Sequence, residues 1–460
     1  MSAPKAPELL SPAGTLRNMR YAYAYGADAV YAGQPRYSLR VRNNDFMQDN
    51  LATGIKEAHA QGKKFYVASN IYPHVRKVDT YMKDMAPVIA LGPDALIMAD
   101  PGLIMLVRER WPEMPVHLSV QSNTVNHATV RFWQSVGVSR VILSRELSLD
   151  EIEEIKQRCP DMELEVFVHG ALCIAYSGRC LLSGYFNHRD PNQGSCTNSC
   201  RWQYKVSEGS EDVSGDIIKI KDFSSLLSAP SMSGCGDIPR HSLADQVYLL
   251  EESERPGEFL PIFEDEHGTY IMNSKDLRAI EHIERLVRIG VDSLKIEGRT
   301  KSHYYVARTA QLYRQAIDDA VAGRPFDFSL PGKLESLANR GYTDGFYQRH
   351  HSDEHQNYLQ NSSDNYKQRF VAEITGYDAA TGLAEVLAKN KFTVGDSLEL
   401  LTPDGNHSFV LERMFDLGGA PRHEVAGSDH RVRIAVPVAV SDKALLARNL
   451  DAGDAIRKTA

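Results

Sequence analysis

The sequence predicts an α/β fold, a (β/α)8 TIM-like barrel followed by a small β-barrel-like domain. Eight short apolar runs recur along the first 300 residues, and amphipathic, helix-like stretches lie between them. Continuous apolar strands that alternate with helices are typical of a parallel sheet, and eight strands are the number that closes such a barrel. An open doubly wound sheet is the alternative, but no G-x-G-x-x-G motif follows the first run, which counts against a dinucleotide-binding fold.

Each predicted strand ends in a polar or small residue. In chain order the strands cover residues 8–14, 29–33, 64–70, 95–100, 116–121, 140–146, 164–170 and 293–299. Apolar residues at helical spacing predict helices over 50–61, 126–137 and 303–322. A further helix over 148–158 begins with Ser148 as N-cap and Glu151 at the capping-box position.

The composition changes along the chain in a way that suggests a division into domains. We expect the barrel to occupy residues 1–335, interrupted by a Cys-rich loop at 170–202 and by an insertion at 205–260 that is rich in Ser, Gly and Asp. The polar segment 336–367 is predicted to be a linker. Residues 368–460 show strand alternation with turn signals, so we expect a small β-domain there.

Four of the six cysteines stand close together with the spacing C-x6-C-x15-C-x3-C: Cys173, Cys180, Cys196 and Cys200. Four thiolates can close a zinc site or hold an iron–sulfur cluster. The spacing fits neither a zinc ribbon nor a bacterial ferredoxin well, and therefore favours an iron–sulfur cluster on a long loop. A zinc site, two disulfides and structural thiols are the alternatives. Cys235 is an alternative fourth ligand.

The bulk properties are those of an ordinary globular protein. The N-terminus has no charged segment followed by an apolar run, and no stretch of about 18 apolar residues is present, so we expect a cytoplasmic protein that does not bind membranes. Cytosolic thiols are kept reduced, which favours metal binding over disulfides. The formal net charge of −8 argues against a broad nucleic-acid-binding face, although a local basic patch is enough to contact RNA.

The predicted strands end in polar residues, and a barrel gathers such residues at its mouth, where active sites lie. These residues are Ser11, Asn70, Asp100, Gln121, Arg145, Glu146, His169, Glu297 and Arg299. The alternative interpretation is that polar loops simply begin at these positions. Several arginines near the first strands and the cysteines favour an anionic substrate. A serine or zinc hydrolase has no motif support.

Three segments carry a resemblance to a known family. They are EVFVHGALCIAYSGRCLLSGY, ELLSPAGTLRNMRYAYAYGADAVYAG and SLKIEGRTKSHYYVARTAQLYRQAID. The chain resembles the peptidase U-32 family, also called collagenase-like peptidases, and its length and C-terminal domain look like those of the tRNA-hydroxylating members. That resemblance implies hydroxylation of the wobble uridine to 5-hydroxyuridine without O₂. It also implies a [4Fe–4S] cluster and prephenate as oxygen donor.

The resemblance also implies roles for individual residues. The cluster ligands carry over onto Cys173, Cys180, Cys196 and Cys200, with Cys235 as the alternative to the last. Prephenate is a dicarboxylate, and the candidates to bind it are, by position, Arg40, Arg42, Arg145 and Arg299. His169 and Glu297 are candidates for proton transfer.

The expected partners are tRNA, a small-molecule oxygen donor and an unidentified electron donor. The alternatives are hydroxylation of 23S ribosomal RNA or of a ubiquinone precursor, a U-32-type peptidase, and a non-catalytic scaffold for another modifying enzyme.

Overall fold

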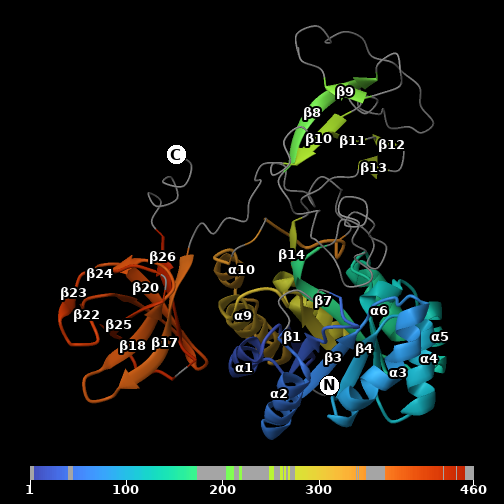
Figure 1. Ribbon diagram of the computed structural model, residues 1–460, viewed down its shortest axis with the longest axis horizontal. Coiled ribbons are helices and arrows are strands. Elements are labelled where there is room, and N and C mark those ends of the chain that lie inside the picture. Colours follow the sequence, from blue (N-terminus) through green and yellow to red (C-terminus); the bar gives the residue numbers. More distant parts are fainter. Residues whose placement is uncertain are drawn as a thin grey trace.

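The computed structural model (Figure 1) describes residues 5–39, 45–172, 275–337, 339, 341–348, 368–427, 429–441 and 443–450. Between 173 and 274 it describes the backbone of six further strands, which are β8 (Tyr204–Glu211), β9 (Ile217–Lys219), β10 (Tyr248–Glu252), β11 (Phe259–Ile262), β12 (Glu264–Asp265) and β13 (Gly268–Thr269). Among the described helices, none combines the length and the apolarity that a membrane crossing requires.

The eight predicted strands form a closed parallel barrel. They are β1 (Glu8–Pro12), β2 (Ala29–Gly33), β3 (Lys64–Ser69), β4 (Ala95–Met98), β5 (Val116–Leu118), β6 (Arg140–Ile142), β7 (Glu163–Ala171) and β15 (Ser293–Ile296). Each strand pairs with the next in parallel, and β15 closes the barrel by pairing with both β1 and β7. The predicted fold class is therefore confirmed.

Helices cover the outside of the barrel (Figure 1). They are α1 (Leu16–Ala24), α2 (Gln48–Ala60), α3 (Val75–Ala90), α4 (Pro101–Arg110), α5 (His127–Ser135), α6 (Leu149–Arg158), α8 (Ile283–Ile289), α9 (His303–Val321) and the short α10 (Leu330–Leu334). The capping box of Ser148 and Glu151 is present at the start of α6. The expected apolar face of α9 is in the core, since Val306, Ala310 and Ile317 are fully buried.

Two short strands extend the wall of the barrel beyond β7. β14 (Asp276–Arg278) pairs antiparallel with β7, and β16 (Tyr342–Thr343) pairs parallel with β14. Leu337 and Tyr347 stand within the segment expected to be linker, yet both are buried, and the Tyr347 hydroxyl donates to the Phe167 carbonyl at 2.6 Å. The described part of this segment therefore packs on the barrel.

The C-terminal region forms a separate antiparallel sheet with its own core. Its strands are β17 (Gln368–Asp378), β18 (Leu383–Ala388), β20 (Ser397–Thr402), β21 (Gly405–Val410), β22 (Met414–Phe415), β23 (Pro421–Arg422), β25 (His430–Ala435) and β26 (Leu445–Asn449), with β19 (Phe392–Thr393) and β24 (Glu424–Val425) as a separate pair. The sheet contacts the barrel through α1 and α9. The Tyr25 hydroxyl, for example, donates to the carbonyls of Leu401 and Lys443, both at 3.0 Å.

Candidate active site

The C-terminal ends of the barrel strands gather a compact group of charged and aromatic side chains. Strand β15 and the residues after it place Lys295, Glu297 and Arg299 on the same side of the strand, because side chains alternate along a strand. Tyr31 of β2 and Phe167 of β7 contribute aromatic rings beside them. All five are less than 10% exposed. In parallel barrels this end carries the active site.

Glu297 and Arg145, both predicted as site residues, meet at the centre of this group. A guanidinium nitrogen of Arg145 lies 3.6 Å from Glu297 Oε2, and the Tyr31 hydroxyl lies 3.5 Å from the same oxygen. The Arg145 guanidinium also stacks 3.8 Å from the centroid of Phe167 and donates to the Ala171 carbonyl at 3.2 Å. Arg145 thus links the end of β7 to the Glu297 carboxylate.

Arg299 fixes the loop that follows β2. It donates to Ser38 Oγ at 2.8 Å and to the Leu39 carbonyl at 2.6 Å, and its guanidinium lies 5.7 Å from the centroid of Tyr31. Glycine at residue 33 leaves room for these contacts, since a Cβ there would come too close to both Arg299 Nη1 and Ser38 Oγ, and the side chains would have to shift. Arg299 therefore fixes the position of the loop after β2 at the mouth, and its charged guanidinium stays buried near Tyr31.

Lys295, which was not among the predicted site residues, lies one layer deeper in the barrel. Its Nζ donates to Glu165 Oε1 at 2.8 Å and lies 4.3 Å from the centroid of Tyr31. Burial lowers the pKa of Lys295, and Glu165 opposes that shift. The alternating Lys, Glu and Arg of the segment KIEGR were the available signal, because period-two spacing puts all three on the inner face.

A buried ionic network continues from Lys295 toward the other end of the barrel. Arg140 donates to Glu8 at 2.6 Å and to Glu163 at 2.8 Å, and lies 3.3 Å from Glu165. Each buried carboxylate thereby has a cationic partner, which offsets the cost of burying the charges.

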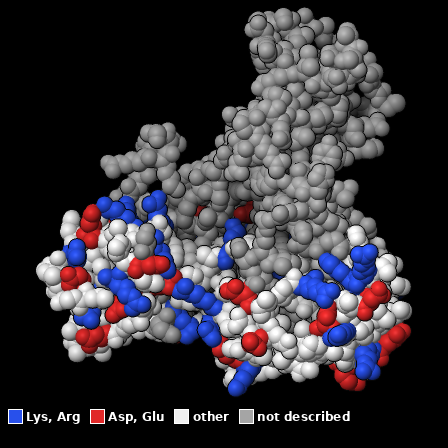
Figure 2. All heavy atoms as spheres, in the orientation of Figure 1, with Lys and Arg blue, Asp and Glu red and all other residues white. Residues whose placement is uncertain are grey.

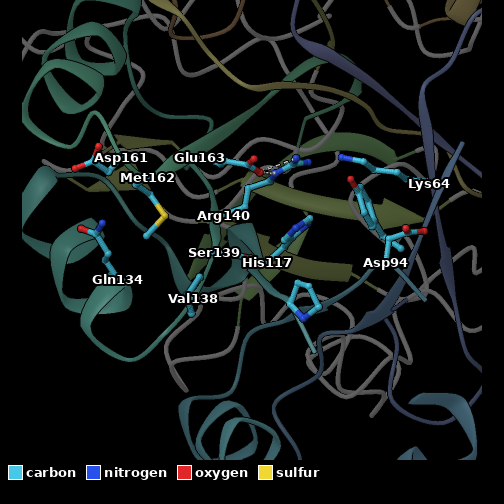
Figure 3. A pocket seen from close by; sticks show the side chains of 12 residues that line it. Lys64, Asp94, His117, Gln134, Val138, Ser139, Arg140, Asp161, Met162 and Glu163 are labelled. Carbon is cyan, nitrogen blue, oxygen red and sulfur yellow. Dashed lines mark hydrogen bonds and ion pairs between the residues drawn. The ribbon is translucent and has the colours of Figure 1, made fainter. Parts of the chain in front are cut away.

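The described residues also line a hollow at the N-terminal ends of the strands (Figure 3). It has a volume of about 520 Å³, and its lining includes Lys64, Tyr66, His117, Arg140 and Glu163. Burial lowers the pKa of His117 well below its usual value, and its Nδ1 has no hydrogen-bond partner among the described residues. The hollow opens at the end opposite the Arg145–Glu297 pair, so we do not regard it as the active site.

His169 lies on the outer side of the barrel wall. The pairing register of β7 and β15 skips one residue, since Lys295 pairs with Phe167 and Ile296 with His169. Such a bulge reverses the side on which the next side chain points. The His169 ring packs against Tyr305, Tyr313 and Tyr342, and burial lowers its pKa to about 3. This position favours Glu297 over His169 for proton transfer.

Of the remaining predicted strand ends, some organise the loops of the mouth and others have an ordinary structural role. Asn70 accepts from the Leu39 amide at 3.2 Å and donates to Ser119 Oγ at 3.2 Å, and the Ser119 hydroxyl donates to Gln121 at 2.9 Å. These side chains organise the loops of the mouth. Asp100 instead caps helix α4 by accepting from the Leu103 amide, so at that position the simpler interpretation of a polar loop start is sufficient.

Several predicted site residues lie outside the described residues, namely Arg40, Arg42, Cys173, Cys180, Cys196, Cys200 and Cys235. The described chain reaches Leu172, next to the Ala171 carbonyl that binds Arg145. Cys159 is the one described cysteine, and it is buried and free. Within the described part of the chain, no group of His, Cys, Asp and Glu side chains is arranged to hold a metal ion.

Comparison with known proteins identifies relatives along almost the whole chain. The model of peptidase family U32 matches residues 14–357, and the model of the peptidase family U32 C-terminal domain matches residues 366–448. The tRNA hydroxylation protein P of Escherichia coli strain K12 is 62% identical over 96% of this chain and 97% of its own length. The protein of the same name from Haemophilus influenzae is 59% identical over 96% of both chains. A 23S rRNA 5-hydroxycytidine synthase of Escherichia coli is 29% identical over 74% of this chain and 45% of its own length.

Proposed function

The chain belongs to peptidase family U32, and we propose that it is an enzyme that hydroxylates tRNA. The observation that carries this proposal is the 62% identity, over almost the full length of both chains, to a protein named for tRNA hydroxylation. The match includes the barrel and the C-terminal domain alike. The protein would act in the cytoplasm, where its tRNA substrate is found.

The proposed product is 5-hydroxyuridine at the wobble position, formed without O₂. A wobble base is unpaired in the anticodon loop and can be turned out of its stack at modest cost. The mouth of the barrel already holds ionised and hydrogen-bonding side chains, among them Arg145, Glu297 and Tyr31, that such a base would meet. Glu297 is the proposed group for proton transfer, because its carboxylate is nearly buried and lies between Arg145 and Tyr31.

Hydroxylation of a pyrimidine ring carbon requires a redox cofactor, and we propose a [4Fe–4S] cluster for this role. Cys173, Cys180 and Cys196 would hold it, with Cys200 or Cys235 as the fourth ligand. The described chain enters the cysteine segment from Ala171, which Arg145 binds, so this segment starts at the mouth. The cluster would supply electron transfer, while the oxygen donor takes up the two electrons that the ring carbon loses; a separate electron donor would serve only to set the oxidation state of the cluster.

The proposed oxygen donor is prephenate, whose two carboxylates call for cationic partners. Arg145 has the more suitable environment, since its contact with Glu297, at 3.6 Å, is longer than a normal hydrogen bond and can be exchanged for a ligand carboxylate. Arg299 is already engaged by Ser38 and Leu39, which favours a supporting role. Arg40 and Arg42 follow directly after Leu39 in the chain and remain candidates.

A second candidate is the hydroxylation of another RNA. It is favoured by the 29% identity to a ribosomal RNA 5-hydroxycytidine synthase. A peptidase has less support, because the sequence carries no motif of a serine or zinc hydrolase.

Nucleoside mass spectrometry of total tRNA from a deletion strain tests the proposal. The strain is complemented with the wild type, with Cys196→Ala or with Cys159→Ala as the matched control, because Cys159 is buried in α6 packing away from the mouth. We expect 5-hydroxyuridine to return with the wild type and the control but not with Cys196→Ala, which should also lack the brown colour of a cluster. An unchanged tRNA profile in the deletion strain would overturn the proposal.

A further inference from the structure

One flank of the barrel mouth carries a positive surface that the proposed chemistry does not use. Helix α3 follows strand β3, so its first turns stand at the same end of the barrel as Glu297 and Arg145. Arg76 and Lys83 are exposed on these turns, and Lys77 is partly exposed. One face of the helix carries Arg76, Thr80 and Lys83, because Thr80 follows Arg76 by four residues and Lys83 follows Thr80 by three.

Arg36, from the loop after β2, adds its charge to the same face. Its guanidinium donates to Thr80 Oγ1 at 3.1 Å and pairs with Asp84, while its side chain stays 53% exposed. The buried Tyr37 fastens this loop to α3 by donating to Asp84 at 2.6 Å. We call the surface formed by Arg36, Arg76, Lys77 and Lys83 the α3 rim.

The α3 rim has an excess of positive charge in a protein that is acidic as a whole. Asp79 and Asp84 are the acidic residues of these turns, and Asp84 is already engaged by Arg36 and Tyr37. Arg76 makes no hydrogen bond or ion pair with any described residue, so its charge is available to a partner. Figure 2 shows Lys and Arg side chains on the described surface of the barrel, with Asp and Glu side chains among them.

Two apolar side chains are exposed at this end of the barrel. Val75, the first residue of α3, is 77% exposed, and Met47, which directly precedes α2, is 64% exposed. A nucleic acid can use both kinds of group, since its phosphates pair with cations and its sugars and bases present apolar faces.

We propose that the α3 rim binds the sugar–phosphate backbone of the tRNA beside the nucleotide that enters the mouth. The identity of the RNA rests on the proposed function, whereas the surface is identified by its charge and its exposure. The rim explains how a chain of net charge −8 attracts a polyanion, since a local group of cations is sufficient for phosphate contacts.

Binding of unmodified tRNA by the full-length protein, followed by fluorescence anisotropy over a range of salt concentrations, tests the rim. The test variant is Arg76→Glu/Lys83→Glu. The matched control is Lys56→Glu/Arg110→Glu, which makes the same charge change at exposed positions in the C-terminal halves of α2 and α4, toward the other end of the barrel. Thermal unfolding of all three proteins verifies that each is folded.

We expect the rim variant to bind tRNA at least tenfold more weakly at about 0.1 M salt, with the slope of log Kd against log salt reduced by about 1.4, because each lost contact to a single-stranded phosphate removes about 0.7. The control should stay within about twofold of the wild type. Equal binding by the rim variant and the wild type would overturn the inference. Weak binding by the rim variant, together with unchanged tRNA nucleosides in the deletion strain, would uphold the rim and remove the proposed activity.

Discussion

Arg308 and Glu399 form a two-pronged ion pair that joins the barrel to the C-terminal sheet. The guanidinium nitrogens of Arg308, on α9, lie 3.1 and 3.0 Å from the two carboxylate oxygens of Glu399, on β20. Arg308 is 1% exposed and Glu399 is 8% exposed. A pair with this geometry holds two surfaces in one orientation, so the C-terminal domain has a fixed position beside α9.

Replacing one partner of this ion pair should destabilise the fold more than replacing both. Arg308→Met leaves the Glu399 carboxylate buried without its cation, and we expect a loss of about 3–5 kcal/mol in the free energy of unfolding. Arg308→Met/Glu399→Met removes both charges and should recover most of that loss. Urea unfolding of the three proteins measures both values, and a double variant as unstable as the single one would contradict this account.

Gly33→Ala should damage the site without unfolding the barrel. The new Cβ would occupy the space of Arg299 Nη1 and Ser38 Oγ, so the loop after β2 and the Arg299 side chain would have to separate. We expect at least a tenfold loss of 5-hydroxyuridine formation and only a small fall in the thermal unfolding temperature. Gly332→Ala is the control, because a Cβ there meets nothing within 4 Å. Full activity of Gly33→Ala would show that the Arg299 contacts are dispensable.

The eight barrel strands could be predicted because each is a continuous apolar run, and burial on both faces leaves that pattern in the sequence. Arg145 and Glu297 could be predicted because each comes at the end of such a run. Lys295 was missed because it stands inside a run, where its charge looks like an interruption; the period-two spacing of the charged residues in KIEGR was the available signal, and its buried partner Glu165 accounts for the charge. The outward position of His169 depends on a one-residue bulge, which has no sequence signal here.

Glu297→Gln tests whether the negative charge of this side chain, rather than its size, is required for activity. The amide keeps the shape of the side chain but cannot accept a proton as a carboxylate does, and Arg145 then faces a neutral group. We expect 5-hydroxyuridine formation to fall by about 100-fold, which is in the range of a lost general acid–base residue, while tRNA binding changes little. The control is Glu153→Gln, at a half-exposed position of α6 whose carboxylate lies 3.5 Å from Arg285. Comparable activity of Glu297→Gln and the wild type would exclude Glu297 from proton transfer.

His169 makes the stability of the barrel depend on pH. Burial lowers the pKa of its ring to about 3 from the ordinary 6.5, and the nearby charges of Lys301 and Arg278 act in the same direction. Between these two pKa values the unfolded chain binds a proton that the folded chain does not, so this residue stabilises the fold above about pH 6.5 and loses that contribution as the pH falls toward 3.

His169→Phe removes the titrating group while keeping an aromatic ring against Tyr305, Tyr313 and Tyr342. Tyr313 retains a hydrogen bond in this variant, because its hydroxyl also donates to the Val168 carbonyl at 2.7 Å. The free energy of unfolding of the wild type, minus that of the variant, should fall by up to about 1.4 kcal/mol for each pH unit below 6.5. Urea unfolding at pH 7, 6, 5 and 4 measures this difference, and a constant value across the series would mean that the His169 ring takes up its proton in the folded protein as readily as in water.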